Sequence, residues 1–273
     1  MNKALKIILL VLAVGISLAM ILNGSSSRFS EVWMDDFSGD KIDETKWTIE
    51  TGNGCPNLCG FGNNEAQYYT DEQSNIRIED GMLIIEAHKT NDPQRPFTSG
   101  KLITKHKADW RYGKIEMKAK LPKGKGTWPA FWMLPTFKDG SMKWPLDGEI
   151  DIMEHVGFNQ GMIYGTIHTQ KYNGSIGTQK SDSLFIRDAH SSFHVYGIEW
   201  SPSEISWYID DQKYLTLKKN DDDYTGWPFD ENEYHLILNL AVGGNWGGRM
   251  GIDEGIWPQQ YVIDYVKYYK LEQ

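Results

Sequence analysis

The sequence predicts an all-β fold in which two antiparallel sheets pack face to face. Short runs that alternate apolar and polar residues recur from about Arg28 to Gln273, and clusters of glycine, proline, asparagine and aspartate separate them. No long stretch of the sequence shows a helical period. Because the sequence contains no internal repeat, linker or change in composition, we predict one domain over residues 28–273.

The first 27 residues differ in character from the rest of the chain. Lys3 and Lys6 precede an apolar run from Ile7 to Leu22, and a short polar spacer follows. This order is typical of an export leader, and a run of about 16 residues lies between the lengths of a cleaved signal peptide and a membrane anchor. We expect residues 1–27 to be one of these, and the protein to be secreted or periplasmic. Contact with a membrane is expected only through this segment.

The charge and the aromatic content narrow the class of ligand. A net charge of -9 is unsuited to binding nucleic acid, which requires a basic surface. The chain holds 11 tryptophans and 14 tyrosines, whose rings can fill a core or stack against the flat faces of sugars. The composition therefore favours a neutral ligand and excludes nucleic acid as a partner.

The clearest predicted strand covers residues 113–122. Its core face is predicted to consist of Ile115, Met117, Ala119 and Leu121, which alternate with charged residues. Further strands are predicted, in chain order, within residues 82–89, 124–135, 148–155, 162–170, 193–211, 234–242 and 261–270.

The two cysteines, Cys55 and Cys59, lie in a glycine-rich stretch with no further Cys or His nearby to complete a zinc site. Export makes a disulfide chemically accessible, and unlinked thiols are the alternative. We favour a local disulfide with little effect on global stability, because the loop that it closes is short.

The stretch "GEIDIMEH" at residues 148–155 carries three acids whose spacing breaks strand alternation. Glu149 and Asp151 share a face, whereas Glu154 should lie on the opposite one. A β-bulge at Ile152 and Met153 would return Glu154 to the face of the other two. The two Glu backbones would then lie roughly 13 Å apart. Carboxyl groups that lean inward could approach to about 5 to 5.5 Å, the separation found in retaining glycoside hydrolases.

Three carboxyl groups at such distances cannot all ionise easily. One Glu would serve as an ionised nucleophile and the other as a general acid and then a general base, with Asp151 sharing a proton with the nucleophile. The alternatives are an acidic strand edge that prevents aggregation and a calcium site.

Tryptophans before and after this stretch support a sugar-binding site. Strand alternation places Trp128, Ala130 and Trp132 on one face, where the two indoles could form a platform for sugar rings. Burial of both indoles in the core is the alternative. Trp144 lies just before the acids, and Asn245 and Trp246 lie on a glycine-rich loop.

At these residues the chain resembles glycoside hydrolase family 16, and within it the laminarinase-type endo-β-1,3-glucanases. The resemblance covers nearly all of the chain after the leader, including "GEIDIME", "FGNNEAQYYT", "YGTIHT", "HVYGIEWSP" and "NLAVGGNWGG". It implies a β-jelly-roll sandwich with a concave substrate cleft and a double-displacement mechanism that retains anomeric configuration. It also implies that Glu149 is the nucleophile, Glu154 the acid/base and Asp151 the residue that assists the nucleophile.

The resemblance implies further site residues. His168 would lie on the next strand and hydrogen-bond toward the acid/base. The expected sugar-binding residues are Trp128, Trp132, Trp144, Asn64, Glu65, Arg111, Asn245 and Trp246. Catalysis would need no cofactor, but a structural calcium ion would bind Asp264 in the last strand, with Glu31 as a second ligand.

The predicted partner is a β-1,3-glucan polysaccharide, with activity on mixed β-1,3-1,4-glucans left open, and the protein is expected to be a monomer. Two departures from the family, Phe61 in place of a tryptophan and the "CPNLC" insert, affect only subsite preference. Two other functions stay open. One is another specificity of the family, such as agarase, and the other is a glucan-binding sandwich without catalysis. Two mutually repelling glutamates argue against the second.

Overall fold

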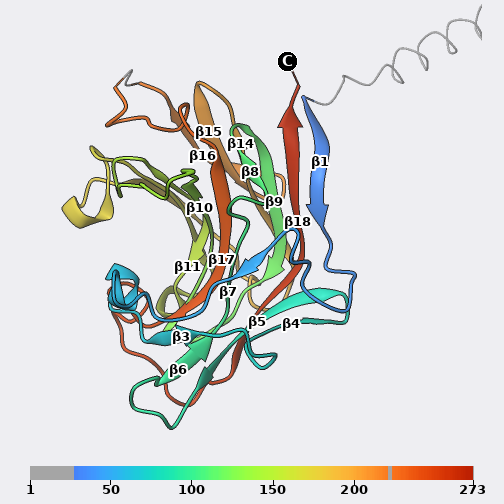
Figure 1. Ribbon diagram of the computed structural model, residues 1–273, viewed down its shortest axis with the longest axis vertical. Helices are drawn as coiled ribbons and strands as arrows, with labels where there is room; N and C mark the ends of the chain where they lie inside the picture. The colour runs from blue at the N-terminus through green and yellow to red at the C-terminus, as the bar shows by residue number, and fades with distance from the viewer. Residues whose placement is uncertain (1–27, 221–222, 273) are drawn as a thin grey trace, which may run out of the picture.

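The computed structural model describes residues 28–220 and 223–272, so the predicted leader at residues 1–27 lies outside the described residues. Two curved β-sheets stack against each other, as Figure 1 shows, which confirms the predicted all-β sandwich. No helix within the described ranges is long and apolar enough to cross a bilayer. The helices described there are three short 3-10 turns, η1 (Cys59–Gly62), η2 (Gly157–Asn159) and η3 (Gly174–Ile176).

The larger sheet has ten strands in the order β16-β15-β14-β9-β18-β5-β6-β3, with β1 paired to β18 and β4 to β5. In chain order its strands are β1 (Phe29–Asp35), β3 (Gln67–Tyr69), β4 (Ile76–Glu79), β5 (Met82–Lys89), β6 (Phe97–Ser99), β9 (Gly113–Lys120), β14 (His194–Trp200), β15 (Glu204–Ile209), β16 (Gln212–Lys218) and β18 (Gln259–Leu271). The pairs are antiparallel except for β3 with β6, which run parallel.

The second sheet has eight strands in the order β13-β12-β11-β10-β17-β7-β2, with β8 paired to β17. In chain order its strands are β2 (Thr48–Ile49), β7 (Lys101–Ile103), β8 (Asp109–Trp110), β10 (Thr127–Pro135), β11 (Glu149–His155), β12 (Met162–His168), β13 (Lys180–Phe185) and β17 (Tyr234–Val242). In Figure 1 this sheet curves so that β10, β11 and β17 turn a concave side away from the ten-stranded sheet.

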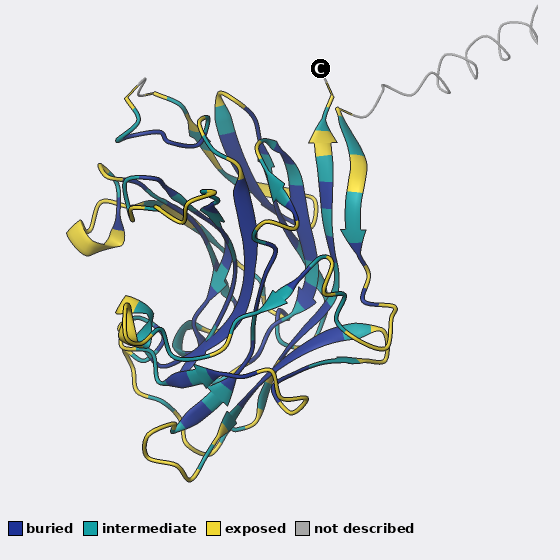
Figure 2. Cartoon of the chain, viewed as in Figure 1, coloured by how far each residue is buried: buried dark blue, intermediate teal, exposed yellow. Residues whose placement is uncertain are grey.

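The hydrophobic core lies between the two sheets, where the strands of both layers are mostly buried (Figure 2). Ile115, Met117 and Ala119 of β9 have no exposed surface, which confirms the predicted alternation in that strand. Phe131 and Met133 of β10 are equally buried and belong to this core. The alternate residues of β10 therefore face the concave side, as predicted.

Candidate active site

The predicted β-bulge interrupts β11 between its second and third acids. On the β12 side, Asp151 pairs with Thr166 and Glu154 pairs with Tyr164. The two residues between the acids therefore oppose the single residue between Thr166 and Tyr164, which is the defining count of a bulge. The pairing of β11 with β10 shifts by one residue at the same place.

Both residues of the bulge belong to the core. Ile152 is 2% exposed and Met153 is fully buried. Because the bulge absorbs one step of the alternation, Glu154 returns to the concave face, where its Oε1 accepts a hydrogen bond from Nε1 of Trp128 at 3.0 Å. The bulge thus places Glu154 on the same face as Glu149 and Asp151, as predicted.

Gly148 allows the chain to enter β11 in this position. Its φ of +87° is a conformation that side chains disfavour. A Cβ atom at this residue would also lie 2.7 Å from both Cγ of Pro228 and Oη of Tyr234. Glycine is therefore required immediately before Glu149.

Glu149 also accepts an indole hydrogen bond. Nε1 of Trp144 donates to its Oε2 at 2.8 Å, and Trp144 itself is 45% exposed. Each of the two glutamates is therefore oriented by one tryptophan N–H, from Trp144 before β11 and from Trp128 on β10. Hydrogen bonds of this kind favour the ionised form of the carboxyl group that accepts them.

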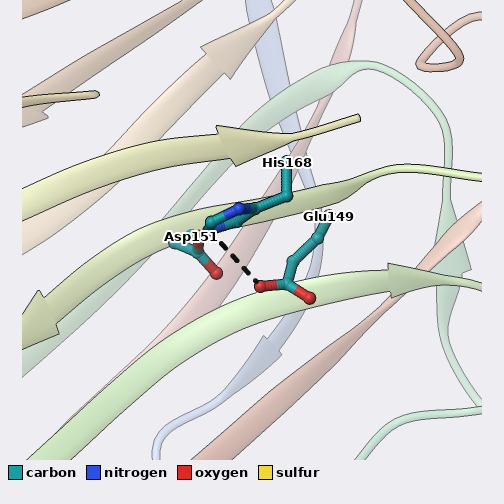
Figure 3. Close-up of side chains that lie close together, drawn as sticks. All are labelled: Glu149, Asp151 and His168. Atoms are coloured by element: carbon teal, nitrogen blue, oxygen red, sulfur yellow. Dashed lines mark ion pairs between the residues drawn. The ribbon is translucent and has the colours of Figure 1, made fainter. Parts of the chain in front are cut away.

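His168 lies over the first two acids of β11 (Figure 3). It pairs across the sheet with Glu149, and its Nε2 lies 3.3 Å from Oδ2 of Asp151 and 3.8 Å from Oε1 of Glu149. The backbone N–H of Gly174 donates to its Nδ1 at 3.1 Å. In the neutral ring the proton must therefore be on Nε2, which presents a donor to the carboxylates.

The prediction that His168 hydrogen-bonds toward Glu154 is therefore wrong. The antiparallel register places Tyr164 opposite Glu154, and His168 lies four residues further along β12. The ring consequently contacts Asp151 and Glu149, at the other end of the acidic group.

Burial raises the pKa of all three acids. Burial first, and then the neighbouring charge of Asp151, raise the pKa of Glu149 to about 8. Burial raises the pKa of Asp151 to about 7, against the effect of its hydrogen bond with Glu149. Burial and the charge of Asp151 also raise the pKa of Glu154 well above its ordinary range. The group therefore keeps protons at neutral pH, as a general acid requires.

The tryptophans on the concave face extend beyond the acids. The Trp246 ring packs edge-on against Trp128 at 5.5 Å between centroids and against Tyr164 at 5.1 Å. The loop that carries Trp246 is joined to the loop at residues 63–65, since Nδ2 of Asn64 donates to Oδ1 of Asn245 at 2.9 Å. The structure thus brings four of the predicted sugar-binding residues into one continuous group beside Glu154.

The comparisons with known proteins agree with this geometry. The model of the glycosyl hydrolases family 16 matches residues 63–267. The chain belongs to glycosyl hydrolase family 16. It is 47% identical to a β-glucanase from Rhodothermus marinus over 88% of this chain and 84% of that protein. It is 41% identical to a glucan endo-1,3-β-glucosidase from Cryptopygus antarcticus, over 86% of this chain and 90% of the relative.

Among solved structures, the laminarinase from Rhodothermus marinus superposes with a TM-score of 0.84 at 45% identity, covering 90% of this chain and 98% of that one. Membership of family 16 confirms the predicted resemblance, the predicted sandwich and the enzyme class, a glycoside hydrolase.

The remaining predicted site residues lie in different surroundings. Glu65 is held by Nε2 of Gln67 at 2.6 Å, and burial raises its pKa. Nη1 of Arg111 donates to the carbonyl oxygen of Asp230 at 3.0 Å, and the contacts described for Arg111 do not include any of the three acids. Its role in sugar binding stays a prediction.

The predicted disulfide is confirmed. Cys55 and Cys59 form a disulfide bond, and three residues lie between them in the chain. The bonded loop leads directly into η1 and then into Asn64, so it lies next to the group of sugar-binding residues.

The predicted calcium ligands do not form one site. Lys118 Nζ lies 2.6 Å from Oδ2 of Asp264, and Lys267 Nζ lies 3.0 Å from Oε2 of Glu31. Glu31 pairs with Tyr269, five residues beyond Asp264 on β18, which separates the two acids by roughly 16 Å. The prediction that both bind one ion is therefore wrong, and each acid instead faces a lysine.

Glu149, Asp151 and His168 also bring potential metal-ligand atoms within 4.8 Å of one another. A metal needs the lone pair of the imidazole nitrogen that it binds. Because Nδ1 of His168 already accepts the Gly174 N–H, Nε2 carries the proton and offers no lone pair. This group fits proton chemistry rather than a metal.

Two residues on the concave face were missed by the sequence analysis. Asn239 of β17 accepts a hydrogen bond from Nε1 of Trp132 at 2.7 Å. Its neighbour across the sheet, Lys101 of β7, places Nζ 6.0 Å from the Trp132 ring and 5.1 Å from the Phe61 ring. The signal for Asn239 was a single polar residue in the apolar run "LILNLAV".

Proposed function

We propose that the protein is a retaining endo-β-1,3-glucanase that hydrolyses laminarin-like β-1,3-glucans and also accepts mixed β-1,3-1,4-glucans. One observation carries the proposal, namely the bulge that brings Glu149 and Glu154 to the same face, each with an indole donor. A relative named as a glucan endo-1,3-β-glucosidase and a solved structure named as an endo-β-1,3-glucanase support the linkage. A solved structure named as a non-specific endo-β-1,3(4)-glucanase, 39% identical, supports the wider range.

In this mechanism, Glu149 attacks the anomeric carbon of the sugar at the cleavage point while Glu154 donates a proton to the departing oxygen. The bond to the leaving sugar breaks, and a covalent glycosyl ester forms on Glu149. Glu154, now ionised, then takes a proton from water, which attacks the ester and releases the sugar with its original anomeric configuration. A second sugar in place of water would give transglycosylation.

Asp151 and His168 serve the nucleophile. Asp151 lies beside Glu149 and shares a hydrogen bond with it, so the two buried carboxyl groups can share one proton and Asp151 helps to position the nucleophile. Nε2 of His168 lies 3.8 Å from Oε1 of Glu149 and 3.3 Å from Oδ2 of Asp151, and its electrostatic attraction favours the ionised form of Glu149. The proposed steps use only side chains and water.

The location and assembly of the protein are part of the same proposal. We infer that residues 1–27 direct export, and the Cys55–Cys59 disulfide supports an oxidising compartment. Since a single chain carries all of the residues assigned to the site, we propose that it acts as a monomer. Detection of the chain in the extracellular or periplasmic fraction and size-exclusion chromatography test these two points.

The function is tested by measuring reducing-sugar release from laminarin, curdlan, lichenan and agarose in parallel. We expect release from laminarin and none from agarose, and the opposite pattern would favour agarase. Glu149→Ala should abolish hydrolysis without unfolding the protein, and added azide should restore turnover of an activated aryl glucoside by replacing the lost nucleophile. Full laminarin hydrolysis by Glu149→Ala would contradict the assignment.

A further inference from the structure

A buried hydrogen bond connects the bulge in β11 to the opposite sheet. Nε1 of Trp207, a residue of β15 with no exposed surface, donates to the backbone carbonyl oxygen of Asp151 at 2.8 Å. Figure 1 shows β15 and β11 in the two separate layers. The indole therefore reaches across the core to the residue at which the bulge begins.

This hydrogen bond gives the backbone carbonyl oxygen of Asp151 a donor at the point where the bulge interrupts the regular hydrogen bonding of β11. A bulge leaves backbone groups of the extra residue and its neighbours without regular partners in the sheet. A buried carbonyl without a donor is destabilising, so such groups are almost always paired. Trp207 supplies the donor for Asp151, and the strand can hold the bulged form without water in the core.

The residue opposite the bulge leaves room for this indole. Gly165 of β12 is the single residue that faces Ile152 and Met153. A Cβ atom on Gly165 would lie 2.5 Å from Cδ1 of Trp207, which is closer than a real Cβ contact allows. The glycine and the tryptophan thus form a matched pair beneath the bulge.

We propose that Trp207 is a positioning residue that holds the bulge and thereby keeps the Glu154 carboxyl group in place for proton transfer. The inference rests on the proposed function, since it assigns Trp207 a role only through Glu154. Without the Nε1–H, the bulge would lose the donor at Asp151, and the segment from Asp151 to Glu154 could shift relative to the rest of β11. The position of Glu149, which precedes the bulge, would change less.

Trp207→Phe tests the inference, because it removes the donor and keeps an aromatic ring in the core. Trp200→Phe is the matched control. Trp200 lies on the neighbouring strand β14, is equally buried, and its Nε1 has no hydrogen-bond partner among the described residues. We expect Trp207→Phe to lower kcat on laminarin by about 10- to 100-fold with little change in KM, whereas Trp200→Phe should not.

The dependence on the leaving group separates positioning of Glu154 from a general structural role. A nitrophenyl glycoside of a β-1,3-linked glucan oligosaccharide needs little protonation of its leaving group, whereas a sugar leaving group needs a general acid. Trp207→Phe should therefore be much less impaired on the nitrophenyl substrate than on laminarin. Equal loss on both substrates, or equal kcat values for Trp207→Phe and Trp200→Phe, would overturn the inference.

If Trp207→Phe unfolds at the assay temperature, the same measurements are made with a benzothienyl side chain at position 207. This group keeps the shape of indole and places sulfur where the N–H was. The proposed function is tested separately by Glu149→Ala. An inactive Glu149→Ala combined with full activity of the benzothienyl variant would leave the glucanase assignment standing and refute the role of Trp207.

Discussion

Trp144→Phe should move the acidic side of the pH profile. The substitution removes the indole donor 2.8 Å from Oε2 of Glu149 and keeps an apolar ring for sugar stacking. A hydrogen bond to a charged group contributes about 1.5–3 kcal/mol, and the lower end applies here because Trp144 is 45% exposed. Since 1.36 kcal/mol corresponds to one pKa unit, about 1.5 kcal/mol predicts a shift of about one unit.

The direction of this shift follows from the charge state. The lost donor stabilised the carboxylate, so its removal raises the pKa of the Glu149–Asp151 pair above the present values of about 8 and about 7. The nucleophile must be ionised for attack. As the pH is lowered, the variant should therefore lose activity at a higher pH than the parent protein does.

The assay is kcat/KM on laminarin as a function of pH, which reports ionisations of the free enzyme. Trp246→Phe is the matched control, because Trp246 belongs to the same face and contacts Trp128 and Tyr164 through its ring. A Trp144→Phe profile whose acidic limb coincides with that of Trp246→Phe would refute the reasoning, whatever the change in KM.

Three further outcomes are expected. Glu154→Gln should reduce hydrolysis of laminarin far more than hydrolysis of an activated aryl glycoside; equal losses in steady-state rates would contradict its role as the acid. Replacing Cys55 and Cys59 together by Ser should change Tm by only a few degrees, because the closed loop is short, and should raise KM for laminarin; a collapse of Tm would show a global role. Asp264→Asn should alter stability by only about 0–1 kcal/mol in chemical denaturation, since Asp264 pairs with Lys118 at the surface, and calcium should not stabilise the parent protein more than the variant.

The sequence was sufficient to predict what depends on local alternation. The core face of β9, the two faces of β10 and the bulge in β11 each follow from the spacing of residues within one strand. The disulfide was also predictable, because its two cysteines are close in the chain.

Features that depend on pairing between distant strands could not be predicted in this way. The partner of His168 is set by the register between β11 and β12, and one strand alone does not contain that information. The separation of Glu31 from Asp264 is likewise set by how β1 aligns with β18. Trp207 and Asn239 were not considered for the site because their partners, Asp151 and Trp132, belong to other strands.

The position of Trp128 has a consequence for how this enzyme can change. The same indole packs against Trp246 through its ring and donates to Glu154 through its nitrogen. A substitution of Trp128 that is selected for binding a different polysaccharide would also change the pKa of Glu154, the proton donor. Substrate range and optimal working pH are therefore expected to evolve together at residue 128, and an engineer who needs to adjust only one of them should begin elsewhere on the surface.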